Sequence, residues 1–95
     1  MTIKQSLVLS AYNTAKRLDK VKPGWFRIID INRLNHYSGA DCILGQIYGD
    51  SIDGPTNLKN MSTGYVSYPH YYSNNFNDMF RAVWTKIIQD RLSRG

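Results

Sequence analysis

Residues 76 to 92 carry large apolar side chains at intervals of three and four, and this stripe constrains the fold more than any other feature. Such spacing places the apolar residues on one face of an α-helix, with Asn77 and Arg81 on the other. Asn74 or Asn75 suits the N-cap position. We predict a long closing helix with one buried face. Its apolar stripe consists of Phe76, Met79, Phe80, Val83, Trp84, Ile87, Ile88 and Leu92.

The first residues predict a second long helix. Thr2 and Gln5 have the spacing of a capping box, in which each side chain bonds to the backbone of the other residue. Pro23 disfavours helical geometry in the residue before it, so this helix should end ahead of the Lys22-Pro23-Gly24 break. The apolar positions that follow at helical intervals are Ile3, Leu7, Val8, Ala11, Ala15 and Leu18.

The chain between these helices is built from short pieces. Residues 25 to 31 form an apolar stretch that fits either a helical turn or a strand, because its length and β-branched residues leave both open. Asp30 is suited to cap a short helical piece that runs to Leu34. From residue 49 to residue 75 the turn formers Gly, Pro, Asn and Asp are frequent, which predicts a long irregular segment.

Length and composition indicate a single folded domain. Ninety-five residues suffice for one modest core, and 42% hydrophobic with 20% charged residues argues against disorder. We predict a mainly α, compact small helical domain over residues 1–95. Long first and last helices should lie around a short central helix at residues 40–48 and pack against it, beside an irregular aromatic-rich loop.

The central helix contains the sequence CILGQIYG, residues 42 to 49, whose cysteine and glycines are unusual inside a helix. At about 100° per residue, the broad apolar face comprises Ile43, Leu44, Ile47 and Tyr48. The opposite side is a seam of small residues, Cys42, Gly45 and Gly49, with Gln46 next to it. We predict that a neighbouring main chain approaches closely at this seam. Gly49 is alternatively the C-terminal stop of the helix.

The seam also has a chemical interpretation. It would make room for a ligand that Gln46 grips, with Cys42 as a wall or a nucleophile. Nucleophilic catalysis needs a base close by, and the only histidines, His36 and His70, stand at no recognised spacing from Cys42. One cysteine and two scattered histidines do not form a tetrahedral zinc set. We therefore expect no enzyme activity, no cofactor and no metal site.

The net charge of +5 is unevenly distributed. Residues 1–33 carry seven basic against two acidic residues, residues 81–95 carry four against one, and the segment between them is acidic. If the two ends are neighbours in the fold, they form one positive surface that attracts nucleic acid, nucleotides or an acidic protein. The alternative is ordinary solvated helix faces. The candidate binding cations are Lys16, Arg17, Lys20, Arg81, Lys86 and Arg91.

Aromatic residues crowd the irregular loop in the sequence SYPHYYSNNF, residues 67 to 76. Tyr68, His70 and Tyr71 would stack on bases if basic residues lie beside them. The same side chains would otherwise anchor the loop on the edge of the core. The sequence has no RNP-type strand, zinc-finger spacing or basic zipper. We place these three residues, with Gln46, among the candidate ligand or partner contacts.

Several short motifs run from residue 18 to residue 91. They are a leucine-aspartate pair, a PGW motif, an arginine-isoleucine pair with a following aspartate, a cysteine-bearing LGQ segment ending in tyrosine-glycine, and a tryptophan-containing helix. The matching residues are Leu18, Asp19, Pro23, Gly24, Trp25, Arg27, Ile28, Asp30, Leu34, Cys42, Leu44, Gly45, Gln46, Tyr48, Gly49, Gly64, Tyr65 and Trp84 through Ile88 to Arg91. Together they resemble a group of small, largely uncharacterised proteins from actinobacteria and their phages. The chain departs from that group in being basic, in lacking Glu and in Ile29, which interrupts the arginine-isoleucine-aspartate spacing. The resemblance implies a phage or phage-derived origin and carries no activity.

These observations favour a binding function. We expect a non-enzymatic phage-type protein that captures a host factor stoichiometrically, whether protein or nucleotide signal, in a counter-defence role. The alternative is a nucleic-acid-binding module that uses the basic surface and the tyrosine-rich loop. No apolar run approaches the roughly 18 residues that span a bilayer, so we expect a protein of the host cytoplasm without a membrane partner. A homodimer formed through surplus apolar residues of the closing helix is a further option.

Overall fold

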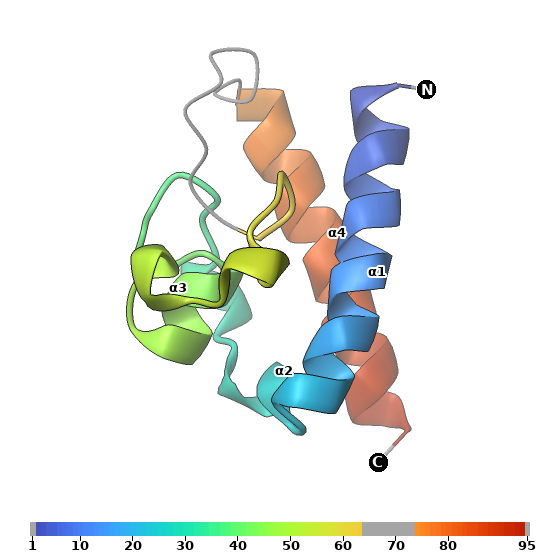
Figure 1. The fold of residues 1–95 in the computed structure, drawn as a ribbon. Coiled ribbons are helices and arrows are strands. Elements are labelled where there is room, and N and C mark those ends of the chain that lie inside the picture. Colours follow the sequence, from blue (N-terminus) through green and yellow to red (C-terminus); the bar gives the residue numbers. More distant parts are fainter. Residues whose placement is uncertain (1, 64–73, 95) are drawn as a thin grey trace.

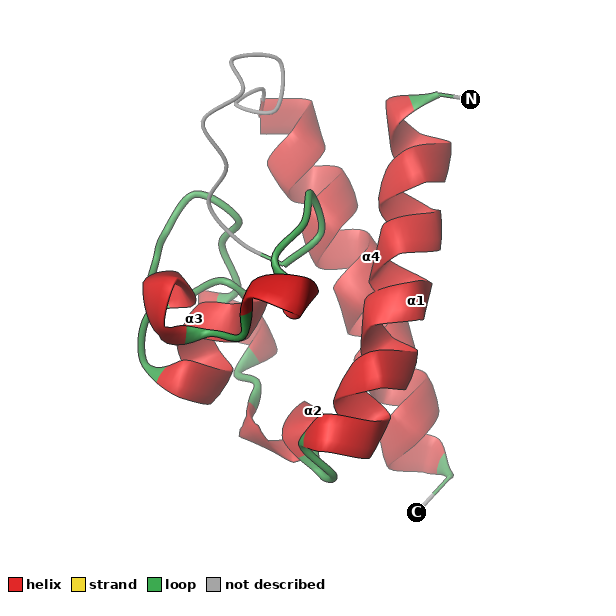
Figure 2. Ribbon diagram, viewed as in Figure 1, coloured by secondary structure: helices red, strands yellow, loops and turns green. Residues whose placement is uncertain are grey.

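The structure, a computed structural model, describes residues 2–63 and 74–94, which form helices joined by loops and turns (Figure 1 and Figure 2). Two long helices stand beside a group of short ones, so the predicted mainly α domain with long first and last helices is confirmed (Figure 1). In chain order the elements are α1 (Ile3–Val21), α2 (Trp25–Ile28), η1 (Ile31–Arg33), α3 (Ile43–Tyr48), η2 (Ser51–Asp53), η3 (Thr56–Leu58) and α4 (Asn74–Ser93).

The first helix, α1, begins and ends where the sequence predicts. The Thr2 hydroxyl accepts a hydrogen bond from the Gln5 amide at 3.1 Å, and the Gln5 side chain accepts one from the Thr2 amide at 2.8 Å. These bonds satisfy donors that the start of a helix leaves open. At the other end, the Lys22 amide donates to the Leu18 carbonyl at 2.8 Å, and Gly24 turns the chain with a φ of 80°.

The two long helices lie side by side and run in the same direction, so both C-terminal ends reach the same end of the molecule (Figure 1). Most residues of the predicted stripes are buried, Val8, Met79 and Val83 are partly buried, and Ile3 and Leu92 near the helix ends are exposed. Helix α4 already includes Asn74 and Asn75, so neither residue is its N-cap. The buried members are Leu7, Ala11, Ala15 and Leu18 from α1, and Phe76, Phe80, Trp84, Ile87 and Ile88 from α4.

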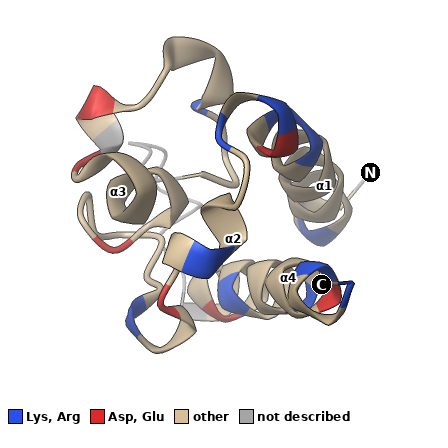
Figure 3. Cartoon of the chain, turned by 90° about the horizontal axis from the view of Figure 1, so that it is seen from below, with Lys and Arg blue, Asp and Glu red and all other residues tan. Residues whose placement is uncertain are grey.

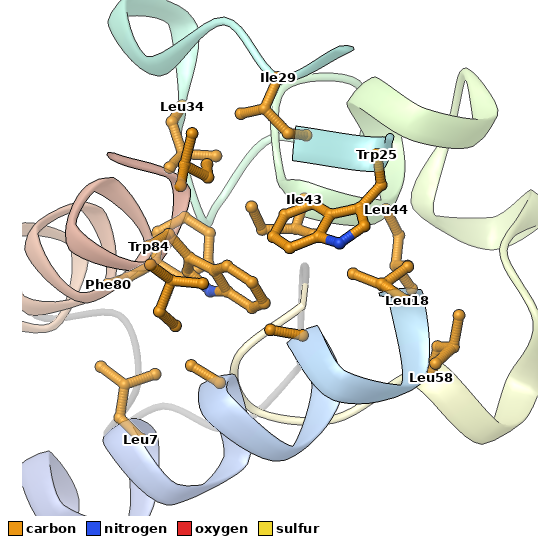
Figure 4. Packing of buried hydrophobic residues seen from close by; sticks show 14 of the residues in the cluster. Leu7, Leu18, Trp25, Ile29, Leu34, Ile43, Leu44, Leu58, Phe80 and Trp84 are labelled. Atoms are coloured by element: carbon orange, nitrogen blue, oxygen red, sulfur yellow. The ribbon is translucent and has the colours of Figure 1, made fainter. Parts of the chain in front are cut away.

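Trp25 lies at the centre of the core (Figure 4). Its ring meets the ring of Trp84 edge to face with centroids 5.7 Å apart, a geometry that aromatic quadrupoles favour. Of the apolar stretch at residues 25 to 31, for which the sequence leaves helix or strand open, Trp25–Ile28 form the one-turn helix α2 and Ile31 belongs to η1. Helix α2 follows the turn at Gly24 and ends where Ile29 becomes extended.

The central helix α3 starts three residues later than predicted, at Ile43. Cys42 has extended backbone angles (φ −76°, ψ 178°) and takes the N-cap position. The residues before it form turns, in which the Cys42 amide donates to the Ser38 carbonyl at 3.1 Å. Residues 40 to 42 therefore belong to a loop. Ile43 and Leu44 are buried and carry α3 into the core.

The long helices contact each other, whereas α3 packs on α2 and on the short turn η2. We expected both long helices to pack directly on the central helix. Buried residues of α1, α3 and α4 share one hydrophobic core with Trp25 of α2, and Trp25 lies near Leu18, Ile43 and Leu44 (Figure 4).

Candidate functional site

The small-residue seam of α3 is filled at Gly45 by the main chain of the preceding turn. A Cβ atom placed on Gly45 would lie 2.7 Å from the carbonyl carbon of Ala40 and 2.8 Å from its carbonyl oxygen. The same atom would overlap the carbonyl oxygen of Gly39. Only glycine fits at such separations. The predicted close approach is confirmed at Gly45, and the approaching chain is the loop directly before the helix.

Gly49 ends α3 and is not part of the packed seam. Its φ of 93° lies in the left-handed region that favours glycine, and its amide donates to the Gly45 carbonyl at 2.8 Å. A Cβ atom at Gly49 would have no described atom within 4 Å. Of the two interpretations that the sequence allows for Gly49, the structure shows the C-terminal stop.

The Cys42 thiol is buried and serves the start of α3. Its Sγ accepts a hydrogen bond from the Gly45 amide at 3.3 Å and lies 3.7 Å from the Gly39 carbonyl oxygen, to which it donates. A Ser or Thr hydroxyl usually fills this N-cap role. Reactive cysteines sit in partly exposed, electropositive surroundings, whereas buried ones are mostly inert. The geometry therefore gives the Cys42 side chain a structural role, which is to cap the N-terminus of α3.

Gln46 joins α3 to the segment before η1. Its side-chain oxygen accepts a hydrogen bond from the Asp30 amide at 2.6 Å, and its side-chain nitrogen donates to the carbonyls of Asp30 and Asp41, both at 3.1 Å. Three main-chain groups thus engage one side-chain amide. These bonds give Gln46 a structural role in the fold.

His36 is fully buried among aromatic rings. Its Nε2 lies 3.1 Å from the Met61 carbonyl oxygen, so Nε2 carries the proton and donates it to this bond. The rings of Phe76 and Phe80 contact the imidazole with centroids 4.8 and 5.0 Å away, and Nδ1 has no hydrogen-bond partner among the described residues. Desolvation lowers the pKa of His36 below its ordinary 6.5, with the Met61 bond opposing.

The loop at residues 60–63, which includes the Met61 partner of His36, is joined to the neighbouring helices by polar contacts. Trp84 Nε1 donates to the Ser62 carbonyl at 2.6 Å, and the Leu44 amide donates to the Thr63 carbonyl at 3.2 Å. Asn60 reaches α1 through a hydrogen bond of 2.8 Å to the Thr14 hydroxyl. Within residues 2–63 and 74–94, no three His, Cys, Asp or Glu side chains gather where a metal ion could sit. The polar groups of residues 60–63 described above form hydrogen bonds that connect this loop to α1, α3 and α4.

The six cations selected from the sequence fall into two groups. Arg17 donates to the Asn57 carbonyl at 3.0 Å, and Arg91 forms a salt bridge of 2.8 Å with Asp19. Both arginines therefore hold elements of the fold together. The other four are exposed and face solvent: Lys16, Lys20, Arg81 and Lys86.

The pair of Arg91 and Asp19 joins the C-terminal ends of α4 and α1. Two guanidinium nitrogens of Arg91, Nε and Nη2, lie 3.0 and 2.8 Å from the Asp19 carboxylate, and the guanidinium also lies 5.8 Å from the centre of the Trp25 ring. Trp25 Nε1 donates to the same carboxylate at 2.8 Å. The hydrogen bond from Arg91 lowers the pKa of Asp19, while partial burial opposes this and the Trp25 bond adds to it. Asp19 is thus paired within the protein.

Because α1 and α4 end together, cations from both ends of the sequence gather at one end of the molecule (Figure 3). Helix α2, which carries Arg27, lies beside these helix ends, and the cations concerned are exposed (Figure 3). We define the basic end as Lys20, Lys22, Arg27 and Arg94. The two basic ends of the sequence are therefore neighbours in the fold; of the cations selected from the sequence, Lys20 belongs to the basic end and Arg91 lies beside it.

The basic end keeps a positive surplus. With Arg91 it holds five cations against the carboxylates Asp19 and Asp90. Arg94 is close enough to Asp19 to lower its pKa electrostatically. Cations at this place also offset the negative ends of the α1 and α4 dipoles. Sequence patterns did not single out Lys22, Arg27 or Arg94, because their proximity depends on the parallel course of the two long helices.

Two cations of the basic end lie over aromatic rings. The Arg27 guanidinium is 4.8 Å from the centre of the Phe26 ring, and the Lys22 ammonium is 5.7 Å from the centre of the Tyr48 ring. Cation–π contacts at exposed sites contribute about 0.5–1 kcal/mol and limit where the cation points. These contacts restrain Lys22 and Arg27 without neutralising their charge.

A shallow hollow lies on α1, away from the basic end. Its volume is about 430 Å³, and its lining comes from the N-terminal half of the helix. Apart from one lysine and one glutamine it is apolar, so it offers few groups that would hold the phosphates of a nucleotide. The lining residues are Lys4, Gln5, Val8, Leu9 and Tyr12.

Three predicted contact residues, Tyr68, His70 and Tyr71, lie outside the described residues. Among residues 2–63 and 74–94, no helix combines the length and the apolar character needed to cross a membrane. Comparison of the chain with models of protein families, with curated proteins and with solved structures gives no match.

Proposed function

We propose that this protein is a non-enzymatic binding protein that captures an anionic partner stoichiometrically through the basic end. The observation that carries the proposal is the meeting of Lys20, Lys22, Arg27 and Arg94 at one end of the molecule, all exposed. Clustered charges of one sign raise the local concentration of oppositely charged partners and speed their association.

The state of the chemically reactive side chains supports a role without catalysis. Cys42 is buried and bonded to the backbone of α3, and His36 is buried among aromatic rings. A nucleophile and its base need to reach each other and a substrate. Neither side chain is exposed to solvent in the described structure.

Protein is the favoured class of partner over a nucleotide signal. The hollow on α1 is almost entirely apolar and lies away from the cations, whereas a nucleotide needs phosphate contacts beside a site for its base. The sequence resemblance extends the proposal to a phage-type protein that occupies a host factor in the host cytoplasm.

Retention on a heparin column tests whether the positive surface is localised. The basic-end variant replaces Lys20, Lys22, Arg27 and Arg94 with Gln. The matched control replaces four exposed cations elsewhere, Lys4, Lys16, Arg81 and Lys86, with Gln, so both proteins lose the same formal charge. We expect the basic-end variant to elute at clearly lower salt than the control. Equal elution of the two variants would refute the proposal.

Nucleic acid is the second candidate partner, favoured by the group of exposed cations at the basic end. This alternative predicts that generic DNA and RNA bind at low salt and are released steeply as salt rises, because each phosphate contact releases counterions. A titration of labelled single-stranded DNA and RNA at increasing salt measures that slope. Lack of binding at low salt would remove the alternative.

A further inference from the structure

We infer that the basic end recognises an acidic amphipathic segment of a partner protein, with carboxylates and aliphatic side chains next to each other. This inference rests on the proposed function and specifies the chemistry of the partner. It depends on three features of the basic end: exposed aliphatic side chains among the cations, cations without carboxylate partners, and aromatic rings that are closed to stacking.

Exposed aliphatic side chains lie at the ends of the same three helices that carry or adjoin the cations. Val21 ends α1, Ile28 ends α2 and Leu92 is in the last turn of α4, with 57%, 48% and 47% of their surfaces exposed. The other large exposed apolar residues of the described chain are scattered over η2 and the first turns of α1. Exposed aliphatic surface and positive charge therefore occur together at the basic end.

The cations of the basic end are available to an incoming carboxylate. Within residues 2–63 and 74–94, the salt bridges are those of Arg33 with Asp41 and of Arg91 with Asp19. Lys22 and Arg27 instead contact the rings of Tyr48 and Phe26. These contacts restrain the two cations without neutralising their charge. Carboxylates of a partner could therefore form charge-assisted hydrogen bonds with them, which are stronger than hydrogen bonds between neutral groups.

The aromatic rings favour a protein partner over nucleic acid. Phe26 and Tyr48 are partly buried against the core, and a cation of the same chain lies over each ring. Bases stack only on ring faces that are open. Exposed Val21 and Ile28 gain from apolar contact, which a hydrated phosphate backbone does not supply. An amphipathic segment with Asp or Glu around Leu or Ile matches both kinds of surface.

Fluorescence anisotropy with synthetic peptides tests the inference. The main probe is a labelled helical peptide of about 18 residues with Glu on one face and Leu on the other. A second peptide has the same composition in scrambled order, and a third keeps the Glu residues but replaces Leu with Gln. At about 0.15 M salt, we expect the amphipathic peptide to bind about tenfold more tightly than either control peptide.

Two pairs of substitutions separate the apolar contribution from the charge. The variant with Val21→Ser and Ile28→Ser should bind the amphipathic peptide about tenfold more weakly and leave heparin retention unchanged. The matched control, Leu9→Ser with Ile52→Ser, removes exposed apolar residues elsewhere and should bind like the original protein. Circular dichroism checks that all four substitutions leave the helices formed.

The outcomes distinguish the inference from the proposed function. Equal affinity for all three peptides, tighter binding of single-stranded DNA, or tighter binding to phosphatidylcholine vesicles that contain phosphatidylserine would overturn the inference. If the basic-end variant still loses heparin retention in those cases, the proposed function stands. If it keeps full retention, the proposed function falls as well.

Discussion

The region around α3 and the basic end differ in how their side chains are used. The α3 region holds the residues that suggest chemistry, such as Cys42, His36 and Gln46, and each is bonded to main chain within the fold. The basic end holds ordinary lysines and arginines that are exposed at the ends of three helices. The comparison teaches that the burial and partners of a side chain, more than its type, indicate which surface is open to another molecule.

This difference has a consequence for mutations. Atoms in the α3 region are in contact with main chain on several sides, so a substitution there acts on the free energy of unfolding. Side chains of the basic end face solvent, so a substitution there should leave folding almost unchanged and act on binding.

The largest effect is expected from Gly45→Ala. The added methyl group would lie less than 3 Å from main-chain atoms of Ala40, and main chain cannot move aside as a flexible side chain can. We expect the free energy of unfolding to fall by about 3 kcal/mol, measured by urea denaturation.

Gly49→Ala is the matched control for that variant. It adds the same methyl group to the same short helix at a place with no described atom within 4 Å, so its cost comes from the φ of 93° alone. We expect a loss of about 1 kcal/mol. A loss at Gly49 that equals or exceeds the loss at Gly45 would contradict the close approach of the loop.

Acid should destabilise the protein through His36. Burial lowers the pKa of His36 in the folded protein, so below pH 6.5 the unfolded chain takes up a proton that the folded chain resists. Stability is therefore complete above this pH and declines as the pH falls from about 7 towards 5, by at most about 1.4 kcal/mol per pH unit for one proton.

Urea denaturation at a series of pH values measures this dependence. His36→Gln keeps a donor for the Met61 carbonyl but removes the titrating ring, and it should flatten the curve in this range. An unchanged slope in that variant would show that another group is responsible. Asp19 is separable, because the lowered pKa of its carboxyl means that its contribution is lost only as the pH falls below 3.8.

The two salt bridges should differ in strength. The Arg91 side chain is 11% exposed and grips Asp19 at two points, whereas the Arg33 side chain is 60% exposed in its pair with Asp41. Lysine cannot reproduce a two-point contact, so we expect Arg91→Lys to lower the free energy of unfolding by about 1 kcal/mol and Arg33→Lys by less than about 0.5 kcal/mol. Equal losses in urea denaturation would show that burial and geometry of the pairs do not matter.

The smallest effect on stability is expected at the basic end. Each single change of Lys20, Lys22, Arg27 or Arg94 to Gln should shift the free energy of unfolding by less than about 0.5 kcal/mol, because these side chains are exposed. Thermal denaturation followed by circular dichroism is sufficient to detect a larger shift. A single change that costs more would mean that its cation also holds the fold together.

Features that depend on a few neighbouring residues could be predicted from the sequence. The capping box of Thr2 and Gln5 formed as expected, and the Asp30 side chain accepts a hydrogen bond from the Asn32 amide at 3.0 Å as a cap should. The apolar stripe of α4 is buried or partly buried from Phe76 to Ile88, because its period matches a helix that packs along another.

Features that depend on distant contacts could not be predicted in the same way. Periodicity gives Gly45 and Gly49 the same face of a helix, but only the course of the loop at residues 39 and 40 shows that one is packed and the other ends the helix. The basic end required the parallel course of α1 and α4, which no local pattern encodes. The pairing of Arg91 with Asp19, 72 residues away, could not be predicted either, because it also depends on how α1 and α4 lie side by side.

The most direct test compares the urea midpoint and the heparin retention of two proteins, Gly45→Ala and the basic-end variant, under conditions in which both are folded. The account predicts opposite results: Gly45→Ala lowers the midpoint and elutes at the original salt concentration, whereas the basic-end variant keeps the midpoint and elutes early. A Gly45→Ala protein with the original midpoint, or a basic-end variant that is retained like the original protein, would contradict the division of roles between the two regions.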